Sequence, residues 1–231
     1  QTCALPILHN LIENKDLNSI KYIYLTASGG PFYGKKVKLS KVTPAQAIKH
    51  PNWQMGKKIS VDSANLMNKV LEVIEASLIF NLSINKFKII IHPQSLIHAI
   101  VEFKNGLSSM LYHLNDMKIP IANSLYNNSC IDFKKKNIFY SDRNLSFYNP
   151  DIKKFPSIKL IKLTQVLNET GFILINVLNE ILVMKFLKRK IHFTDIVVNL
   201  IDILNSKLVK NYLKNNRDRK STRLNSSHVK R

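Results

Sequence analysis

Acidic residues are scarce in this chain of 231 residues, which has 15 Asp and Glu against 35 Lys and Arg and a net charge of +20. Cysteine is scarcer still. Cys3 and Cys130 are too few for a disulfide framework and lack metal-ligand spacing, so a reducing cytoplasm is the expected compartment. With 6 Gly and 8 Pro the chain is not collagen-like, and 45% hydrophobic residues suffice for the core of one or two domains.

Long apolar runs are also missing. The longest, from Phe172 to Met184, is interrupted by Asn176, Asn179 and Glu180, so no transmembrane helix is predicted. The N-terminus has no basic region leading into an apolar one, and hence no visible signal peptide. We therefore expect no membrane partner.

The excess positive charge is partly local. Residues 217–231 hold six basic residues and one acidic residue, which is +5 of the total and leaves +15 for the rest. That remainder is spread along the chain with abundant Asn and Ile, which favours background charge and small anionic ligands over a nucleic-acid surface. The alternative is a basic, non-enzymatic module that binds RNA or another polyanion.

The two ends do not continue the patterns beside them. Residues 1–7 and 221–231 resemble translated sequencing-adapter sequence, so 1–7 is interpreted as a non-native scar and 217–231 as a non-native basic tail. Both are excluded from the expected fold, and the natural protein is expected to begin further upstream.

The remaining residues predict an α+β domain followed by a small all-α helical bundle. β-Branched and aromatic residues predict strands at Lys21–Ala27 and Phe87–Ile91, and Asn105-Gly106 predicts a hairpin between 96–103 and 107–114. Short helices are expected near 44–49 and 120–126. The expected domains are a catalytic α+β domain at 8–127, a linker at 128–154 and a helical domain at 155–216.

Three helices are expected in the second domain, at 157–170, 172–190 and 194–215. Ser157 and Thr194 are plausible N-caps and Gly171 is a plausible C-terminal residue.

The strongest helix of the first domain is expected to start at an N-cap on Asp62 or Ser63, with apolar residues from Leu66 onward at helical spacing. On its wheel, one polar arc holds Asn65, Asn68, Lys69, Glu72 and Glu75. A solvated face explains such an arc without function. However, Asn68 and Lys69 near a Ser-capped helix start also suit an anion, and Glu72 one turn further on could hold a metal beside it.

Other segments offer weaker signals. Ser28-Gly29-Gly30 follows a strand and could bring N–H groups to a phosphate, although most such turns are only turns. The loop His50–Gly56 contains the single Trp and suits a lid, or else Trp53 only anchors it to the core. His92 and His98 lie beside strands, where a structural role is the commoner one.

Taken in order, five segments resemble the 1-deoxy-D-xylulose 5-phosphate reductoisomerase family. They are TASGGPF at 26–32, HPNWQM at 50–55, GKKISVDSANLMNKVLEVIE at 56–75, HPQSLIH at 92–98 and MKIPIA at 117–122. Asn179-Glu180 and the residues 193–196 resemble the family's C-terminal helical region. The resemblance runs from about residue 10 to about residue 204.

The resemblance implies an enzyme of non-mevalonate isoprenoid synthesis that converts deoxyxylulose 5-phosphate to methylerythritol 4-phosphate by rearrangement and reduction. It implies NADPH and Mg²⁺ or Mn²⁺ as cofactors, a phosphorylated sugar as substrate, a homodimer, no nucleic-acid partner, and a bacterial-type cytoplasmic or a plastid location. The implied site residues are Ser28, Ser63, Asn68 and Lys69 for the phosphate, Glu72 for substrate and metal, His50, Trp53 and Met55 in the lid, and His50 and His98 as catalytic residues.

Two parts of the family pattern are not found. Its Asp-Ser-Glu motif, which supplies the other metal ligands, and its N-terminal NADPH-binding Rossmann domain both lie upstream of the first matching segment. The expectation is therefore a fragment that is inactive alone, because one carboxylate rarely holds Mg²⁺ tightly and no cradle for NADPH remains.

Overall fold

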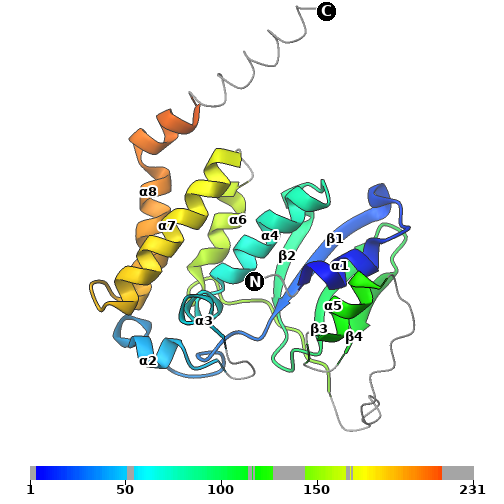
Figure 1. Cartoon of the computed structure of the whole chain (residues 1–231), viewed down its shortest axis with the longest axis horizontal. Helices are drawn as coiled ribbons and strands as arrows, with labels where there is room; N and C mark the ends of the chain where they lie inside the picture. The colour runs from blue at the N-terminus through cyan, green and yellow to red at the C-terminus, as the bar shows by residue number, and fades with distance from the viewer. Residues whose placement is uncertain are drawn as a thin grey trace, which may run out of the picture.

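The computed structural model describes residues 4–50, 55–113, 116, 118–126, 144–164, 167 and 169–214. Its centre is a four-stranded sheet in the order β2-β1-β3-β4 (Figure 1), formed by β1 (Ile20–Ala27), β2 (Phe87–Ile91), β3 (Ile97–Phe103) and β4 (Ser108–Tyr112). β2 is parallel to β1, and β3 is antiparallel to both β1 and β4. Both predicted single strands and the predicted hairpin are confirmed.

The hairpin turn is built by Asn105-Gly106, although not as a two-residue loop. Gly106 has a φ of +88°, and its N–H donates to the Phe103 carbonyl oxygen over 3.1 Å. The Leu107 N–H donates to Asn105 Oδ1 over 3.0 Å. A left-handed glycine after a turn is typical of a three-residue hairpin loop with a bulge, which keeps β3 and β4 in register.

Helices lie in both halves of the chain. In the first half these are α1 (Ala4–Ile12), α2 (Pro44–Ala47), α3 (Lys57–Ala64), α4 (Met67–Ile79) and α5 (Lys118–Leu125). Short 3-10 turns lie at Leu17–Ser19, Leu39–Lys41, Ile84–Lys86 and Pro156–Ile158. α1 packs on β3, β4 and α5, whereas α4 packs on β1.

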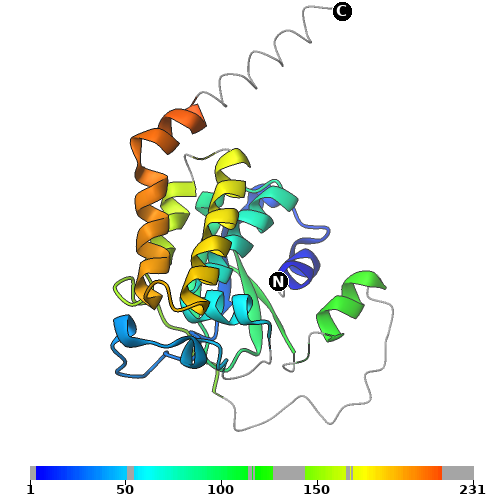
Figure 2. The ribbon, with the colours of Figure 1, turned by 60° about the vertical axis from the view of Figure 1, so that its left-hand side comes forward.

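The second half contributes α6 (Lys159–Thr164), α7 (Glu169–Leu187) and α8 (Phe193–Asn205), and residues 207–214 are also helical. α7 lies beside α8 and α3, and α6 lies against α4 (Figure 2). One buried apolar cluster joins side chains of the sheet, α3, α4 and these C-terminal helices. The predicted order of an α+β part followed by helices is confirmed, while the domain boundaries stay predictions.

The proposed helix ends in the second half were wrong. Gly171 lies in the first turn of α7, where a Cβ would meet the Leu167 side chain at 2.8 Å, so it is there for close packing. Ser157 is fully buried in a 3-10 turn. α8 is capped by His192 in place of Thr194, because the Asp195 carboxylate accepts the His192 N–H over 2.9 Å.

Excluding residues 1–7 from the fold was wrong for residues 4–7. They form the first turn of α1, and Leu5 and Ile7 are buried in the core. α1 is amphipathic enough to cover β3, which explains their burial. Residues 217–231 lie outside the described part of the chain.

By length and composition alone, α7 is apolar enough to cross a membrane. A single helix of this kind is weak evidence for a membrane span, since core helices of soluble proteins pass the same test. In this structure, 33% of its apolar window is buried. The exclusion of a membrane partner therefore stays a prediction.

Candidate active site

The site lies where α3 ends and α4 begins, and the predicted N-cap there was wrong. Asp62 and Ser63 lie in the last turn of α3. Asp62 cannot cap α4 because its carboxylate is already used: Lys58 Nζ lies 2.9 Å from Oδ2, and Asn179 Nδ2 donates to Oδ1 over 2.9 Å. The second of these contacts ties α3 to α7.

The junction itself is held in an uncommon backbone conformation. Leu66 has a φ of +62°, which is rare for a residue other than glycine. The Met67 N–H donates to Asn65 Oδ1 over 2.9 Å, and Ser157 Oγ donates to the Asn65 carbonyl oxygen over 2.5 Å. These contacts start α4 at Met67, so Asn68 and Lys69 lie in its first turn.

Lys69 and Glu72 form a buried ion pair on α4. Lys69 is 7% exposed and Glu72 is 2% exposed, so the interpretation of this arc as a solvated face was wrong. Lys69 Nζ donates to both carboxylate oxygens of Glu72, over 3.0 and 2.8 Å. Burial raises the pKa of Glu72 above its usual range, and the neighbouring ammonium only partly opposes that effect.

The turn after β1 closes over this junction. Gly29 and Gly30 have positive φ values, and a Cβ on Gly30 would lie 2.9 Å from the Ser63 carbonyl oxygen. This close approach requires glycine. Ser28 Oγ accepts the Gly30 N–H over 3.3 Å and lies 3.3 Å from His50 Nε2. The structure therefore brings Ser28, His50 and Ser63 together.

The charge of Lys69 contributes to lowering the pKa of two predicted histidines. Burial, and then Lys69, lowers the pKa of His50. Burial lowers the pKa of His98 to about 3, with further contributions from His113, Lys69 and His92. Both imidazoles are thus neutral at neutral pH, and each can donate or accept a single hydrogen bond to a ligand.

His113 was missed by the sequence reasoning. It follows β4, is 6% exposed, and stacks on His98 with ring centroids 4.7 Å apart. The spacing of the sequence does not indicate this pair, because the register pairs Ile97 with Tyr112 after an irregularity and places His113 opposite Leu96.

The remaining predicted residues are placed less decisively. The Asn68 Oδ1 atom, next to Lys69 in the chain, is buried and has no hydrogen-bond partner among the residues that the structure describes. Met55 is half-buried just before α3. Trp53 lies outside the described residues, so its part in a lid stays a prediction. His92 has structural contacts: its Nδ1 lies 2.9 Å from the Ser146 carbonyl oxygen and its ring stacks on Phe147.

The metal site expected at Glu72 is not complete in the part of the chain that the structure describes. No group of three or more His, Cys, Asp or Glu side chains lies there within reach of one metal ion. Glu72 has an ammonium as its direct partner. A hard divalent cation needs several oxygen ligands, so these residues do not form the site by themselves.

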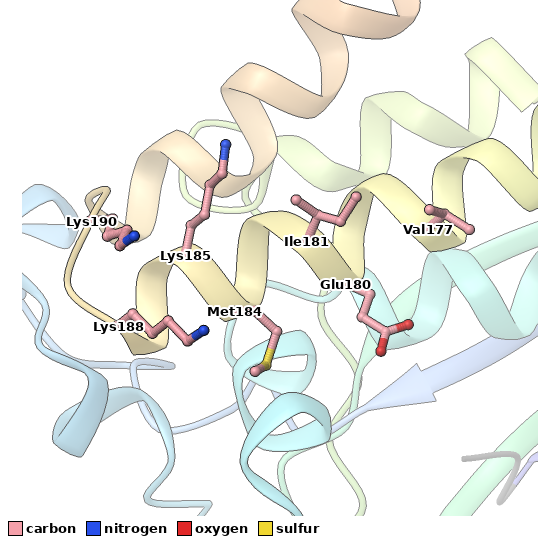
Figure 3. Close-up of a pocket in the computed structure, with 7 residues that line it drawn as sticks. All are labelled: Val177, Glu180, Ile181, Met184, Lys185, Lys188 and Lys190. Carbon is pink, nitrogen blue, oxygen red and sulfur yellow. The ribbon is translucent and has the colours of Figure 1, made fainter.

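A groove away from this site does not bring its side chains to one point. A groove of about 480 Å³ runs along α7, lined by Val177, Glu180, Ile181, Met184, Lys185, Lys188 and Lys190. In Figure 3, Lys185 and Met184 point to opposite sides of the helix, so these side chains do not converge on one point.

Two family models match the chain. One is described as the 1-deoxy-D-xylulose 5-phosphate reductoisomerase C-terminal domain and covers residues 4–80, and the other, the DXP reductoisomerase C-terminal domain, covers residues 114–226. Together they span both the α3–α4 junction and the C-terminal helices. The chain belongs to the 1-deoxy-D-xylulose 5-phosphate reductoisomerase family.

Individual members of this family are similar over most of the chain. The 1-deoxy-D-xylulose 5-phosphate reductoisomerase of Pelagibacter ubique is 46% identical over 201 residues, which are 85% of this chain and 51% of that protein. The Endomicrobium trichonymphae enzyme is 43% identical over 90% of this chain and 52% of its own length. The chain thus spans about half the length of these relatives.

Solved reductoisomerase structures share the fold. A crystal structure of DOX-P reductoisomerase in complex with NADPH, fosmidomycin and magnesium matches with a TM-score of 0.77 and 39% identity, over 84% of this chain and 48% of that one. The Zymomonas mobilis enzyme in complex with NADPH matches with a TM-score of 0.77 and 33% identity, over 87% of this chain and 52% of that one. The family resemblance inferred from the five motifs is confirmed.

Proposed function

We propose that this chain supplies the substrate-binding centre of an NADPH- and metal-dependent reductoisomerase that converts 1-deoxy-D-xylulose 5-phosphate to 2-C-methyl-D-erythritol 4-phosphate in isoprenoid synthesis. The observation that carries the proposal is the buried Lys69 ammonium, which contacts Glu72 and whose charge acts on His50 and His98 from two other segments. A lysine is rarely buried without a partner of opposite charge. A sugar phosphate is an anion that can serve as that partner.

In the ligand-free chain Glu72 takes the place of the anion. Both carboxylate oxygens of Glu72 contact Lys69 Nζ. A phosphate that enters must share or replace these contacts, and charge-assisted hydrogen bonds to phosphate are strong enough to do so. In this proposal Ser28, Ser63 and Asn68 complete the phosphate site. Its support is that Ser28 Oγ accepts the Gly30 N–H, that Gly30 lies against the Ser63 carbonyl oxygen, and that Asn68 precedes Lys69 in the first turn of α4.

His50 and His98 act on the sugar end of the substrate in this proposal. Their lowered pKa values keep both rings neutral. A neutral imidazole orients a hydroxyl or carbonyl group by hydrogen bonding without adding charge that would compete with Lys69. His50 and Met55 flank the residues expected to close over the substrate together with Trp53.

NADPH and Mg²⁺ or Mn²⁺ are the proposed cofactors, supported by the ligands of the related crystal structures. Glu72 would contribute one metal ligand. The described residues lack the other ligands and show no glycine-rich strand-turn-helix, so we propose that groups outside them complete both sites and that the chain alone does not turn over substrate.

A homodimer in the cytoplasm is the proposed state of the whole enzyme. Its support is the outer face of the sheet, where Tyr24, Ile100 and Met110 lie side by side across three strands and Met110 is 44% exposed. Partly exposed apolar sheet faces of this kind suit protein–protein contacts.

Fosmidomycin, a substrate analogue, is bound in a related crystal structure, and calorimetric titration of the chain with it, in EDTA, tests the proposed phosphate site. We expect saturable binding at one site that inorganic phosphate displaces. A generic RNA oligonucleotide is the comparison ligand. Tight RNA binding with a steep loss of affinity on adding salt, and no binding of fosmidomycin, would favour the polyanion-binding alternative.

A further inference from the structure

We propose that His113 is a positioning residue for His98, holding its imidazole ring in the orientation that meets the substrate. The inference rests on the proposed function, in which His98 contacts the sugar. His113 lies outside the five segments that carry the family resemblance.

The geometry of the pair comes from the hairpin. β3 and β4 pair Ile97 with Tyr112, with an irregularity in the register between Ile97 and Ile100. The His113 N–H donates to the Leu96 carbonyl oxygen over 3.1 Å, which fixes the backbone beyond the end of β4. His98 and His113 then stack with an interplanar angle of 26° and with 7% and 6% of each residue exposed.

Stacking is the contact that sets the orientation of the His98 ring. Its Nε2 atom is buried and has no hydrogen-bond partner among the described residues. Histidines at functional sites are usually oriented by a hydrogen bond to the second ring nitrogen. Here a buried aromatic partner covers the ring plane and limits its rotation, which leaves Nε2 available to a ligand.

Charge around His98 works in the same direction. The titratable groups that face it are His113 beyond β4, Lys69 on α4 and His92 after β2. All three disfavour a proton on His98, and two stacked imidazoles cannot both become cations at low cost. His113 therefore helps to present His98 as a neutral ring.

Two variants test whether His98 needs an aromatic ring at position 113. His113→Phe keeps an aromatic partner of similar shape, whereas His113→Ala removes it. Phe147→Ala is the matched control, because it removes an equally close stack, with centroids 4.7 Å apart, from a different histidine, His92.

The first measurement needs no ligand. In ¹³C-histidine NMR between pH 8 and pH 5, we expect the His98 Cε1–H resonance to stay flat in the wild type, His113→Phe and Phe147→Ala. In His113→Ala it should titrate, because the ring becomes freer and better hydrated. A flat resonance in His113→Ala, or titration in His113→Phe as in His113→Ala, would overturn the inference.

The second measurement titrates the same proteins with fosmidomycin. We expect binding to His113→Ala to be about three- to tenfold weaker, the range for loss of an aromatic contact, and both other variants to bind like the wild type. Equal affinity in His113→Ala would overturn the positioning role. If the wild type itself does not bind, the proposed function fails, while the ligand-free titration still decides whether His113 orients His98.

Discussion

Lys69 and Glu72 show how a helix face that looks solvated becomes part of a site. Their spacing of three residues allows an ion pair on any helix, and the sequence alone favours an exposed one. In the structure the pair is buried, and the charge of Lys69 acts on His98 of β3. Because both charges are removed from water, each is costly to keep in the folded chain without the other.

Removing one charge of this pair should be costly. Lys69→Met leaves the Glu72 carboxylate buried without its counter-ion, and we expect the free energy of unfolding to fall by about 3 to 5 kcal/mol. The double variant Lys69→Met/Glu72→Leu removes both charges and should recover most of that loss. Urea denaturation of the three proteins checks this, and equal losses in the single and double variants would show that the pair is not desolvated.

His98 should make stability depend on pH. Its pKa is about 3 in the folded chain and near 6.5 when unfolded, so the unfolded state binds the extra proton. The stability that neutral His98 contributes is complete above about pH 6.5 and is lost as pH falls toward 3. The slope from this one group approaches about 1.4 kcal/mol per pH unit.

Replacing His98 by Asn should remove that slope. Unfolding curves of the wild type and His98→Asn between pH 7.5 and pH 4.5 measure it. As the pH falls, the unfolding free energy of the wild type should decrease more than that of His98→Asn. A difference that is constant with pH would contradict a depressed pKa for His98.

At the scale of elements, the parts predicted well are those with local signals. β-Branched and aromatic residues define β1 and β2, and Asn105-Gly106 defines the hairpin. The break between α3 and α4 was not predictable in this way. Leu66 takes a left-handed conformation next to Asn65, whose carbonyl oxygen accepts a hydrogen bond from Ser157, far along the chain, and no local pattern encodes that contact.

The contact between the turn after β1 and the end of α3 can be tested with two glycines. Gly30 and Gly34 both have positive φ values, +67° and +70°. A Cβ on Gly30 meets the Ser63 carbonyl oxygen at 2.9 Å, whereas a Cβ on Gly34 meets nothing within 4 Å.

We expect Gly34→Ala to lower the unfolding free energy by about 1 kcal/mol for the backbone conformation alone. Gly30→Ala should lose about 1 to 3 kcal/mol more, because the extra methyl group overpacks the junction. Thermal or urea denaturation gives both values. Equal losses would mean that the turn does not lie against α3 as closely as the structure shows.

At the scale of the whole molecule, the sheet, α3, α4 and the C-terminal helices share one core and place the site at their meeting point. The positive charge that dominates the composition is not needed to explain this site, which uses one buried lysine. The motifs predicted its members because they lie in four of the five short segments. Their mutual contacts, and the contribution of His113, depend on packing between segments and needed the structure.

The central claim is that Lys69 binds the phosphate of the substrate and that Glu72 occupies Lys69 in its absence. Calorimetric titration of the chain with 1-deoxy-D-xylulose 5-phosphate, in EDTA and at constant pH, tests it with the wild type, Glu72→Gln and Lys69→Met/Glu72→Gln. Glu72→Gln frees the ammonium without leaving an unpaired carboxylate, so it should bind about tenfold more tightly than the wild type. The double variant, without the ammonium, should lose measurable binding. Weaker binding by Glu72→Gln than by the wild type, or undiminished binding by the double variant, would contradict the account.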